Sequence, residues 1–117
     1  MMRLHFHPLS PYSRKAWVAI TLRGDDVELR QIDVRKGGLQ APEFLALSPF
    51  GKMPVLECDG GPIIESSSII EYLEERGPRV LLPAASERLA RHFDRLGDLY
   101  LIEPAAARWW RPESEEG

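Results

Sequence analysis

The chain of 117 residues contains a single cysteine, Cys58. One cysteine allows no internal disulfide, no Cys-x-x-Cys redox pair and no cysteine-rich zinc site. The chemistry of this chain is therefore not dithiol exchange. A free cysteine within a strand behaves as a small hydrophobic residue, so we expect Cys58 to be buried.

The chain also lacks an excess of basic charge and any long apolar run. Its 15 Lys and Arg stand against 18 Asp and Glu, giving a formal net charge of −3. Such a balance offers no electrostatic footprint for nucleic acid or an anionic membrane. No segment approaches the length of a membrane span, and the N-terminus lacks the pattern of a secretion signal. We expect a cytoplasmic protein that binds neither nucleic acid nor membrane.

Several catalytic patterns are missing as well. No Gly-x-Ser-x-Gly elbow surrounds any serine, no His and Asp complete a triad with Ser10, and the glycine patterns of phosphate loops and dinucleotide sites are absent. A hydrolase or a nucleotide-dependent enzyme is therefore not indicated. His5 and His7 share a predicted strand, but nothing nearby supplies further ligands, so we expect no metal site.

The sequence does contain a regular alternation of strand and helix signals. Period-two alternation predicts strands at residues 4–7, 27–33, 55–58 and 62–64, and helical spacing predicts helices at 11–23, 42–47 and 66–76. Within the first helix, we expect a buried face formed by Trp17, Val18, Ile20 and Leu22. The order βαβ-α-ββα predicts an α/β domain whose four-stranded mixed sheet has helices on both faces.

The predicted elements divide the chain into three parts. Residues 1–77 form the α/β domain, 78–85 a linker, and 86–117 the first helix of an incomplete all-helical domain with an acidic tail. Helical spacing resumes at Ser86 and continues to about Tyr100 or Leu101, and the element runs on to residues 109–112 before the acidic tail. Because one helix makes no domain, its apolar face, with Trp109 and Trp110, needs further chain or a partner subunit to cover it.

A serine hydroxyl stands where the first strand gives way to the first helix. Ser10 suits the N-cap position and Pro11 the first helical position, while Gly24 closes the helix. A hydroxyl at a helix N-terminus can hold an anion. Ser13, one turn further along, is a competing donor.

Three separated motifs resemble the cytosolic glutathione S-transferases. The first is Ser10 with residues 11–15, the second spans 42–56 and the third 64–73. The resemblance covers about the first 83 positions, and the linker and last helix match the start of that family's helical domain. It implies a thioredoxin-like fold, glutathione as co-substrate, a small hydrophobic electrophile and, at full length, a homodimer. It leaves conjugation, isomerase, dehalogenase and peroxidase chemistry open.

The same resemblance assigns roles to residues. Ser10 matches the catalytic serine of the theta, zeta and phi-like classes and would stabilise the glutathione thiolate, with Ser13 as the alternative. Met53 would pair with the cysteinyl backbone beside a cis Pro54, with Lys52 next to the peptide. Further residues are assigned to the two ends of glutathione: Glu65 and Ser66 to the γ-glutamyl end, and Gln40 or Lys36 to the glycine carboxylate.

Each of these residues also has a purely structural interpretation. Ser10 and Ser66 cap helices, worth about 1 kcal/mol each, Pro54 shapes a loop, and Glu65 is a first-turn acid favoured by the helix dipole. The main alternative function is therefore a non-catalytic regulator or scaffold resembling the stringent starvation proteins, which bind partner proteins. Ser10 and the Glu65 and Ser66 pair argue against it, whereas the absence of a basic residue near position 39 argues for it.

Overall fold

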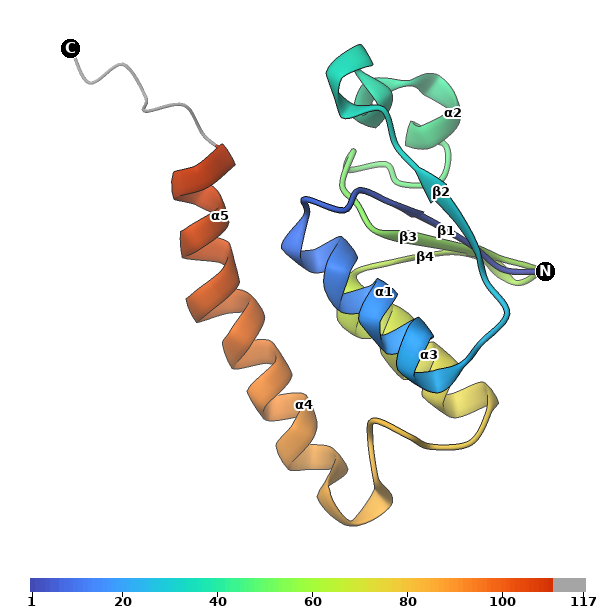
Figure 1. The fold of residues 1–117 in the computed structure, drawn as a ribbon, viewed down its shortest axis with the longest axis vertical. Helices are drawn as coiled ribbons and strands as arrows, with labels where there is room; N and C mark the ends of the chain where they lie inside the picture. Colours follow the sequence, from blue (N-terminus) through green and yellow to red (C-terminus); the bar gives the residue numbers. More distant parts are fainter. Residues whose placement is uncertain (111–117) are drawn as a thin grey trace.

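A four-stranded mixed sheet forms the centre of the structure, a computed structural model that describes residues 1–110. The strands are β1 (Arg3–Phe6), β2 (Glu28–Gln31), β3 (Val55–Cys58) and β4 (Gly61–Ile64), in the order β2-β1-β3-β4. β1 and β2 run parallel, whereas β3 is antiparallel to both β1 and β4 (Figure 1). The predicted mixed sheet is therefore confirmed.

Helices cover both faces of this sheet. α1 (Pro11–Arg23) and α3 (Ser66–Arg76) lie side by side on one face. Their core contains Leu4, Phe6 and Leu56 of the sheet with Ala16, Ile20, Ile69 and Leu73. On the other face, the short helix α2 (Pro42–Leu45) places Phe44 against Ile32 and Val55. This arrangement confirms the helices expected on both faces from the order of elements and the thioredoxin-like fold that the family resemblance implies.

The caps of α1 are those that the sequence predicts. The Ser10 hydroxyl accepts the backbone N–H of Ser13 at 3.2 Å, and Pro11 occupies the first turn. Gly24 adopts a left-handed conformation with φ 74°, and its N–H donates to the carbonyl of Ile20. A residue with a Cβ is strained at this φ, which explains glycine at the end of the helix.

The buried face of α1 differs from the prediction. Val18 and Leu22 are exposed, and the buried positions are Ser13, Ala16, Ala19 and Ile20. With 3.6 residues per turn, these four lie on one side of the helix, opposite Val18 and Leu22. The small side chains allow α1 to approach the sheet and α3 closely, so residue size rather than hydrophobicity sets the buried face.

Two strand predictions also need correction. β2 is shorter than the predicted 27–33, and all four of its residues are exposed at one edge of the sheet. Of the predicted strand, only Ile32, which follows β2, is buried. Cys58 is half-buried at the end of β3 rather than buried. Its thiol donates to the carbonyl of Gly61 at 3.0 Å.

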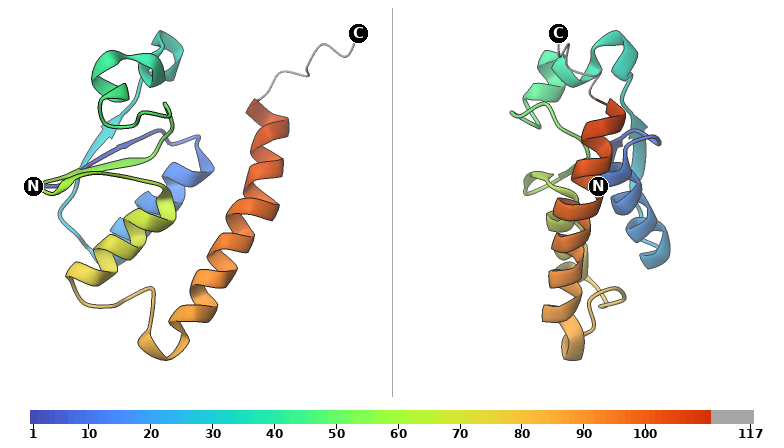
Figure 2. Two further views of the ribbon diagram at one scale, coloured as in Figure 1. Left: turned by 180° about the vertical axis from the view of Figure 1, so that it is seen from behind. Right: turned by 90° about the vertical axis from the view of Figure 1, so that its left-hand side faces the viewer.

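A long helix stands beside α1 and α3 (Figure 2). It comprises α4 (Glu87–Leu96), a π-helical segment (Gly97–Ile102) and α5 (Glu103–Trp110). The helix therefore continues beyond the clear helical spacing that ends near Tyr100. Pro104 has no N–H for the carbonyl of Tyr100, which favours a wider turn at this point. No helix among residues 1–110 has the length and apolar character needed to cross a membrane.

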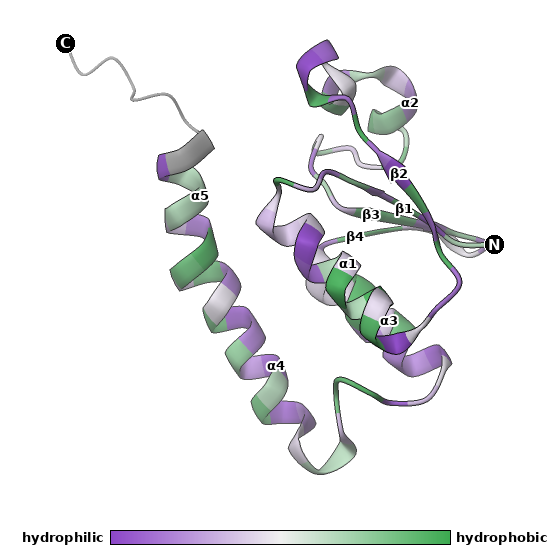
Figure 3. Ribbon diagram, viewed as in Figure 1, coloured by the Kyte–Doolittle hydropathy of each residue, from purple (hydrophilic) through white to green (hydrophobic). Residues whose placement is uncertain are grey.

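The long helix mixes apolar and polar residues along its length (Figure 3). Exposed apolar side chains follow it, as expected for a helix that needs a further covering layer: Leu89, Phe93, Leu99, Tyr100 and Leu101. The expected interface role of the Trp109 and Trp110 side chains, and the acidic tail 113–117, lie outside the described part of the chain.

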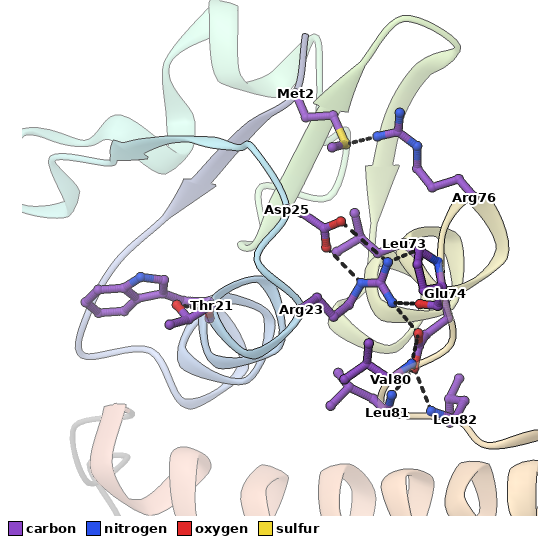
Figure 4. A network of polar contacts seen from close by, with 12 residues as sticks. Met2, Thr21, Arg23, Asp25, Leu73, Glu74, Arg76, Val80, Leu81 and Leu82 are labelled. Carbon is purple, nitrogen blue, oxygen red and sulfur yellow. Dashed lines mark hydrogen bonds and ion pairs between the residues drawn. The ribbon is translucent and has the colours of Figure 1, made fainter.

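A buried ion pair fixes the connection between α3 and the long helix (Figure 4). Arg23 at the end of α1 pairs with Glu74 of α3, and both side chains are only 2% exposed. The Glu74 carboxylate accepts backbone N–H groups from Val80, Leu81 and Leu82. Arg23 also donates to the carbonyl of Pro78 at 2.7 Å. The linker is thereby held against the ends of both helices.

The charge of Glu74 is favoured despite its burial. Burial raises the pKa of this carboxyl, but the N–H donors of Val80, Leu81 and Leu82, together with Arg23, outweigh that effect and hold the pKa below its ordinary value. A carboxylate with a lowered folded-state pKa stabilises the fold above its unfolded-state pKa and loses this contribution as the pH falls.

We predict that Glu74→Gln lowers the free energy of unfolding by about 1.5–3 kcal/mol near neutral pH, because the linker N–H groups and Arg23 lose their charged acceptor. Arg23 keeps a second carboxylate partner, Asp25, at 2.8 Å. Urea denaturation of the variant and the wild-type protein measures this difference. Glu75→Gln is the matched control, since Glu75 is the exposed neighbour on the same helix.

The same pair of proteins tests the pH dependence. The stability difference should be full above the unfolded-state pKa of about 4.3 and should shrink as the pH falls below it, because the wild-type carboxylate becomes protonated. A Glu74→Gln protein as stable as wild type at pH 7 would contradict the account of the linker.

Candidate functional site

Two serines meet at the turn between β1 and α1, but only one of them faces a cavity. Ser13 is fully buried, and its hydroxyl accepts the backbone N–H of His7 at 3.2 Å. Ser10 is 4% exposed and lies in the wall of a hollow of about 520 Å³, which we call the Ser10 hollow. The Ser10 oxygen accepts one hydrogen bond, and its hydroxyl donates to no other group within residues 1–110. Its O–H can therefore donate to a group in this hollow.

The walls of the Ser10 hollow come from four parts of the chain. His7 and Leu9 belong to the turn after β1, and Lys52 and Met53 to the loop before β3. The 3-10 turn Val34–Lys36 contributes Val34 and Arg35, and α5 contributes Glu103, Ala106 and Ala107. The long helix is therefore part of the site and not only an appendage to it.

A second hollow of about 670 Å³, the Glu65 hollow, adjoins the first. It lies at the start of α3, where Glu65 and Ser66 meet the loop that carries Met53 and Pro54. The two hollows share four wall residues: Tyr12, Lys52, Met53 and Glu103. A ligand can thus extend from Glu65 to Ser10 along a continuous wall.

The loop between the hollows has the predicted cis peptide bond, between Met53 and Pro54. Ser48, which is buried, holds this loop: its hydroxyl donates to the carbonyl of Lys52 at 2.8 Å and accepts the Lys52 N–H at 3.2 Å. Met53 is thereby placed in the walls of both hollows.

Glu65 has an unusual backbone conformation. Its φ of 77° is the one positive φ at a non-glycine residue within positions 1–110. Glutamate rarely adopts this region, and residues held there cluster at functional sites. Glu65 precedes α3 without a side-chain cap, so the first N–H groups of this helix have no capping side chain. Ser66, at 2% exposed, is the first residue of that helix.

The structure brings most of the predicted site residues together. Ser10, Lys52, Met53, Pro54, Glu65 and Ser66 all line one or both hollows. Gln40 does not line either of them; it ends a 3-10 turn and lies beside Gly51. Lys36 is also absent from these walls, whereas its neighbour Arg35 is present. Sequence reasoning missed Arg35 because it looked for a basic residue near position 39.

Sequence reasoning also missed a contact between α1 and α5. The Tyr12 hydroxyl donates to the Glu103 carboxylate at 2.7 Å. Burial and this hydrogen bond raise the pKa of Tyr12, so its hydroxyl stays protonated. The two residues are separated by 91 positions, and no local pattern relates them.

A second contact between α1 and the long helix lies close by. The Lys15 ammonium pairs with Asp94 at 2.7 Å and Asp98 at 2.8 Å, and it donates to the Ser67 hydroxyl at 3.0 Å. Ser67 in turn donates to Asp94. Since Asp98 and Ser67 line the Glu65 hollow, this cluster fixes one side of the site.

The two strand histidines have separate environments. His5 is bonded to Glu57 at 2.8 Å on the sheet, and this bond, aided by the charges of His5 and Arg3, holds the pKa of Glu57 below its ordinary value. His7 lines the Ser10 hollow, and its Nδ1 accepts the N–H of Leu9 at 3.1 Å. Within the part of the chain that the structure describes, no cluster of three potential metal ligands is present.

With this geometry established, comparison with known proteins defines the class. Residues 4–80 match the family model described as the N-terminal domain of glutathione S-transferases. The chain belongs to the glutathione S-transferase family, of which it carries the thioredoxin-like N-terminal domain, followed in this chain by the long helix.

Individual relatives support this assignment. A glutathione S-transferase from Pseudomonas putida is 34% identical over 97% of this chain and 50% of its own length. A maleylacetoacetate isomerase from Pseudomonas aeruginosa is 38% identical over 80% of this chain and 45% of its own length. Among solved structures, human glutathione transferase theta-2 in complex with glutathione has a TM-score of 0.72 at 28% identity, covering 84% of this chain and 42% of its own. The chain thus spans at most half the length of these relatives.

We predict that Lys15→Met loosens the long helix, because Asp94 and Asp98 then face each other without the shared cation. Amide hydrogen exchange in residues 94–103 should lose about tenfold in protection, equivalent to about 1.4 kcal/mol. Lys36→Met is the control, since Lys36 is 86% exposed and its nearest carboxylate is 3.9 Å away. Unchanged exchange in Lys15→Met would show that the cluster does not hold the helix.

Proposed function

We propose that this chain binds glutathione across the two hollows and stabilises its thiolate for attack on a small electrophile. The observation that carries the proposal is the wall that the two hollows share. This wall connects the Glu65 hollow, which offers a carboxylate and a helix N-terminus, to the Ser10 hollow, which offers a hydroxyl donor. Membership of the glutathione S-transferase family supports the same ligand.

The Glu65 hollow suits the γ-glutamyl end of glutathione, which carries an ammonium and a carboxylate. The Glu65 carboxylate can pair with the ammonium, and the Ser66 hydroxyl with the uncapped N-terminus of α3 can bind the carboxylate. The unusual φ of Glu65 lets it stand at the start of this helix and still line the hollow.

The middle and far end of the peptide would follow the shared wall. Met53 can pair its main chain with the cysteinyl residue, as an added strand does at a sheet edge. We assign the glycine carboxylate to Arg35 and Lys52, which line the Ser10 hollow, in preference to Gln40, which does not.

Ser10 is the best-placed donor for the thiolate. The Tyr12 hydroxyl already donates a hydrogen bond to Glu103, and Ser13 lines neither hollow. A free thiol has a pKa of about 8.5, and lowering it by two units requires about 2.7 kcal/mol. A charge-assisted hydrogen bond together with the N-terminus of α1 supplies a stabilisation of that order.

For the assembled enzyme we extend the proposal to a hydrophobic electrophile as the second substrate, a homodimer and a cytoplasmic location. The uncovered apolar side chains of the long helix support the presence of a further covering layer.

Calorimetric titration with glutathione tests the proposal. We expect saturable binding in the millimolar range or tighter, and no heat of binding at millimolar ligand would overturn the function. In that case the non-catalytic alternative would account for the fold.

Replacing Glu65 tests the clamp. Glu65→Gln removes the charge opposite the ammonium, and we expect glutathione affinity to fall about 10- to 100-fold, the range for loss of a charge-assisted hydrogen bond. Glu75→Gln serves again as the control because this exposed residue lines neither hollow. Equal glutathione affinities in both variants would show that Glu65 does not bind the ammonium.

Replacing Ser10 tests the thiolate. Ser10→Ala should raise the pKa of the bound thiol by one to two units, which corresponds to about 1.4–2.7 kcal/mol. Ultraviolet absorbance of the thiolate as a function of pH measures this shift. Ser13→Ala should lower the stability of the fold and leave the thiol pKa in place. The opposite pattern would move the role to Ser13.

A further inference from the structure

The hydrogen bond between Tyr12 and Glu103 occupies a particular place in the site. Both residues line both hollows, so their bonded side chains stand where the Ser10 hollow meets the Glu65 hollow. Glu103 begins α5, and the hydrogen bond fixes its carboxylate at this boundary. The carboxylate accordingly lies close to the place where a thiol bound at Ser10 would react.

The remaining wall of the Ser10 hollow is largely apolar. Leu9 and Pro11 line it from the start of α1, and α5 adds Ala106 and Ala107 beside Glu103. Val34 and Leu39 complete this apolar lining. A hydrophobic group attached to the glutathione sulfur would be accommodated by these side chains.

The charged groups of this hollow are distributed unequally. Arg35, Lys52 and His7 come from the thioredoxin-like domain, on the side assigned to the glutathione peptide, whereas Glu103 is the one charged group that α5 contributes to the hollow. The glycine carboxylate of glutathione would match Arg35 and Lys52. Glu103 forms no ion pair with any residue in positions 1–110. With glutathione bound, its negative charge would remain to face the second substrate.

We infer that Glu103 selects the electrophile by charge: the site accepts neutral or cationic apolar groups and disfavours groups that carry a carboxylate. This inference rests on the proposed function. By this inference, the site disfavours substrates that carry two carboxylates. Maleylacetoacetate, which appears in the name of the relative from Pseudomonas aeruginosa, is such a substrate.

Three S-substituted glutathiones of similar size provide the test without requiring turnover. S-propylglutathione carries a neutral group, S-(carboxymethyl)glutathione an anionic group and S-(2-aminoethyl)glutathione a cationic group. Calorimetry with the wild-type protein should give about tenfold tighter binding of the propyl than of the carboxymethyl derivative, with the aminoethyl derivative at least as tight as the propyl. A tenfold ratio is the effect of a like-charge contact of about 1.4 kcal/mol.

Glu103→Gln removes the charge and keeps a side chain of the same length that can accept the Tyr12 hydrogen bond. The ratio of propyl to carboxymethyl affinity should fall from about tenfold to about twofold or less. Because the ratio is taken within one protein, a general loss of affinity cancels. Glu75→Gln, outside both hollows, should keep the wild-type ratio. Tyr12→Phe retains the carboxylate and should also keep discrimination against the anionic derivative.

The outcomes separate this inference from the proposed function. Binding of unsubstituted glutathione reports the function, and the ratio reports the selection. If glutathione binds but the wild-type ratio is close to one, or if Glu103→Gln leaves the ratio at its wild-type value, the charge selection by Glu103 is wrong while the function stands. If unsubstituted glutathione does not bind, both are wrong.

Discussion

The buried Glu74 carboxylate is the constraint on which the arrangement of the site depends. It accepts N–H groups from Val80, Leu81 and Leu82 and pairs with Arg23, so the end of α3, the end of α1 and the linker are held at one point. The direction in which the chain leaves this point places the long helix beside α1. Without that placement, Glu103 would not reach Tyr12, and the Ser10 hollow would lack its wall from α5.

The two hollows along the shared wall suit different parts of a ligand. The Glu65 hollow offers a carboxylate and an uncapped helix N-terminus, which suit the two charges of a zwitterion. The Ser10 hollow offers a hydroxyl at a second helix N-terminus and an apolar lining. In the function proposed above, a peptide that spans both hollows would be bound by its charged end and would present its thiol to the Ser10 hydroxyl.

Local signals explain what could be predicted from the sequence. The Ser10 cap, the Gly24 end and the hairpin of β3 and β4 each depend on a few adjacent residues, and the structure has all three. Long-range packing explains the rest. The exposure of Val18 and Leu22 follows from the close approach of Ala16 and Ala19 to neighbouring elements. The positions of Arg35 and Glu103 in the wall of the Ser10 hollow depend on the course of a turn and of the linker. Hydrophobic periodicity in the sequence does not predict the course of either segment.

Chemical-shift mapping by NMR during a glutathione titration tests the central claim most directly. The account predicts that the largest backbone amide shifts fall on Ser10, Met53 and Ser66, with further shifts at Arg35 and Glu103, because these residues surround the two adjoining hollows. Shifts confined to residues outside the two hollows, or none at saturating ligand, would contradict it.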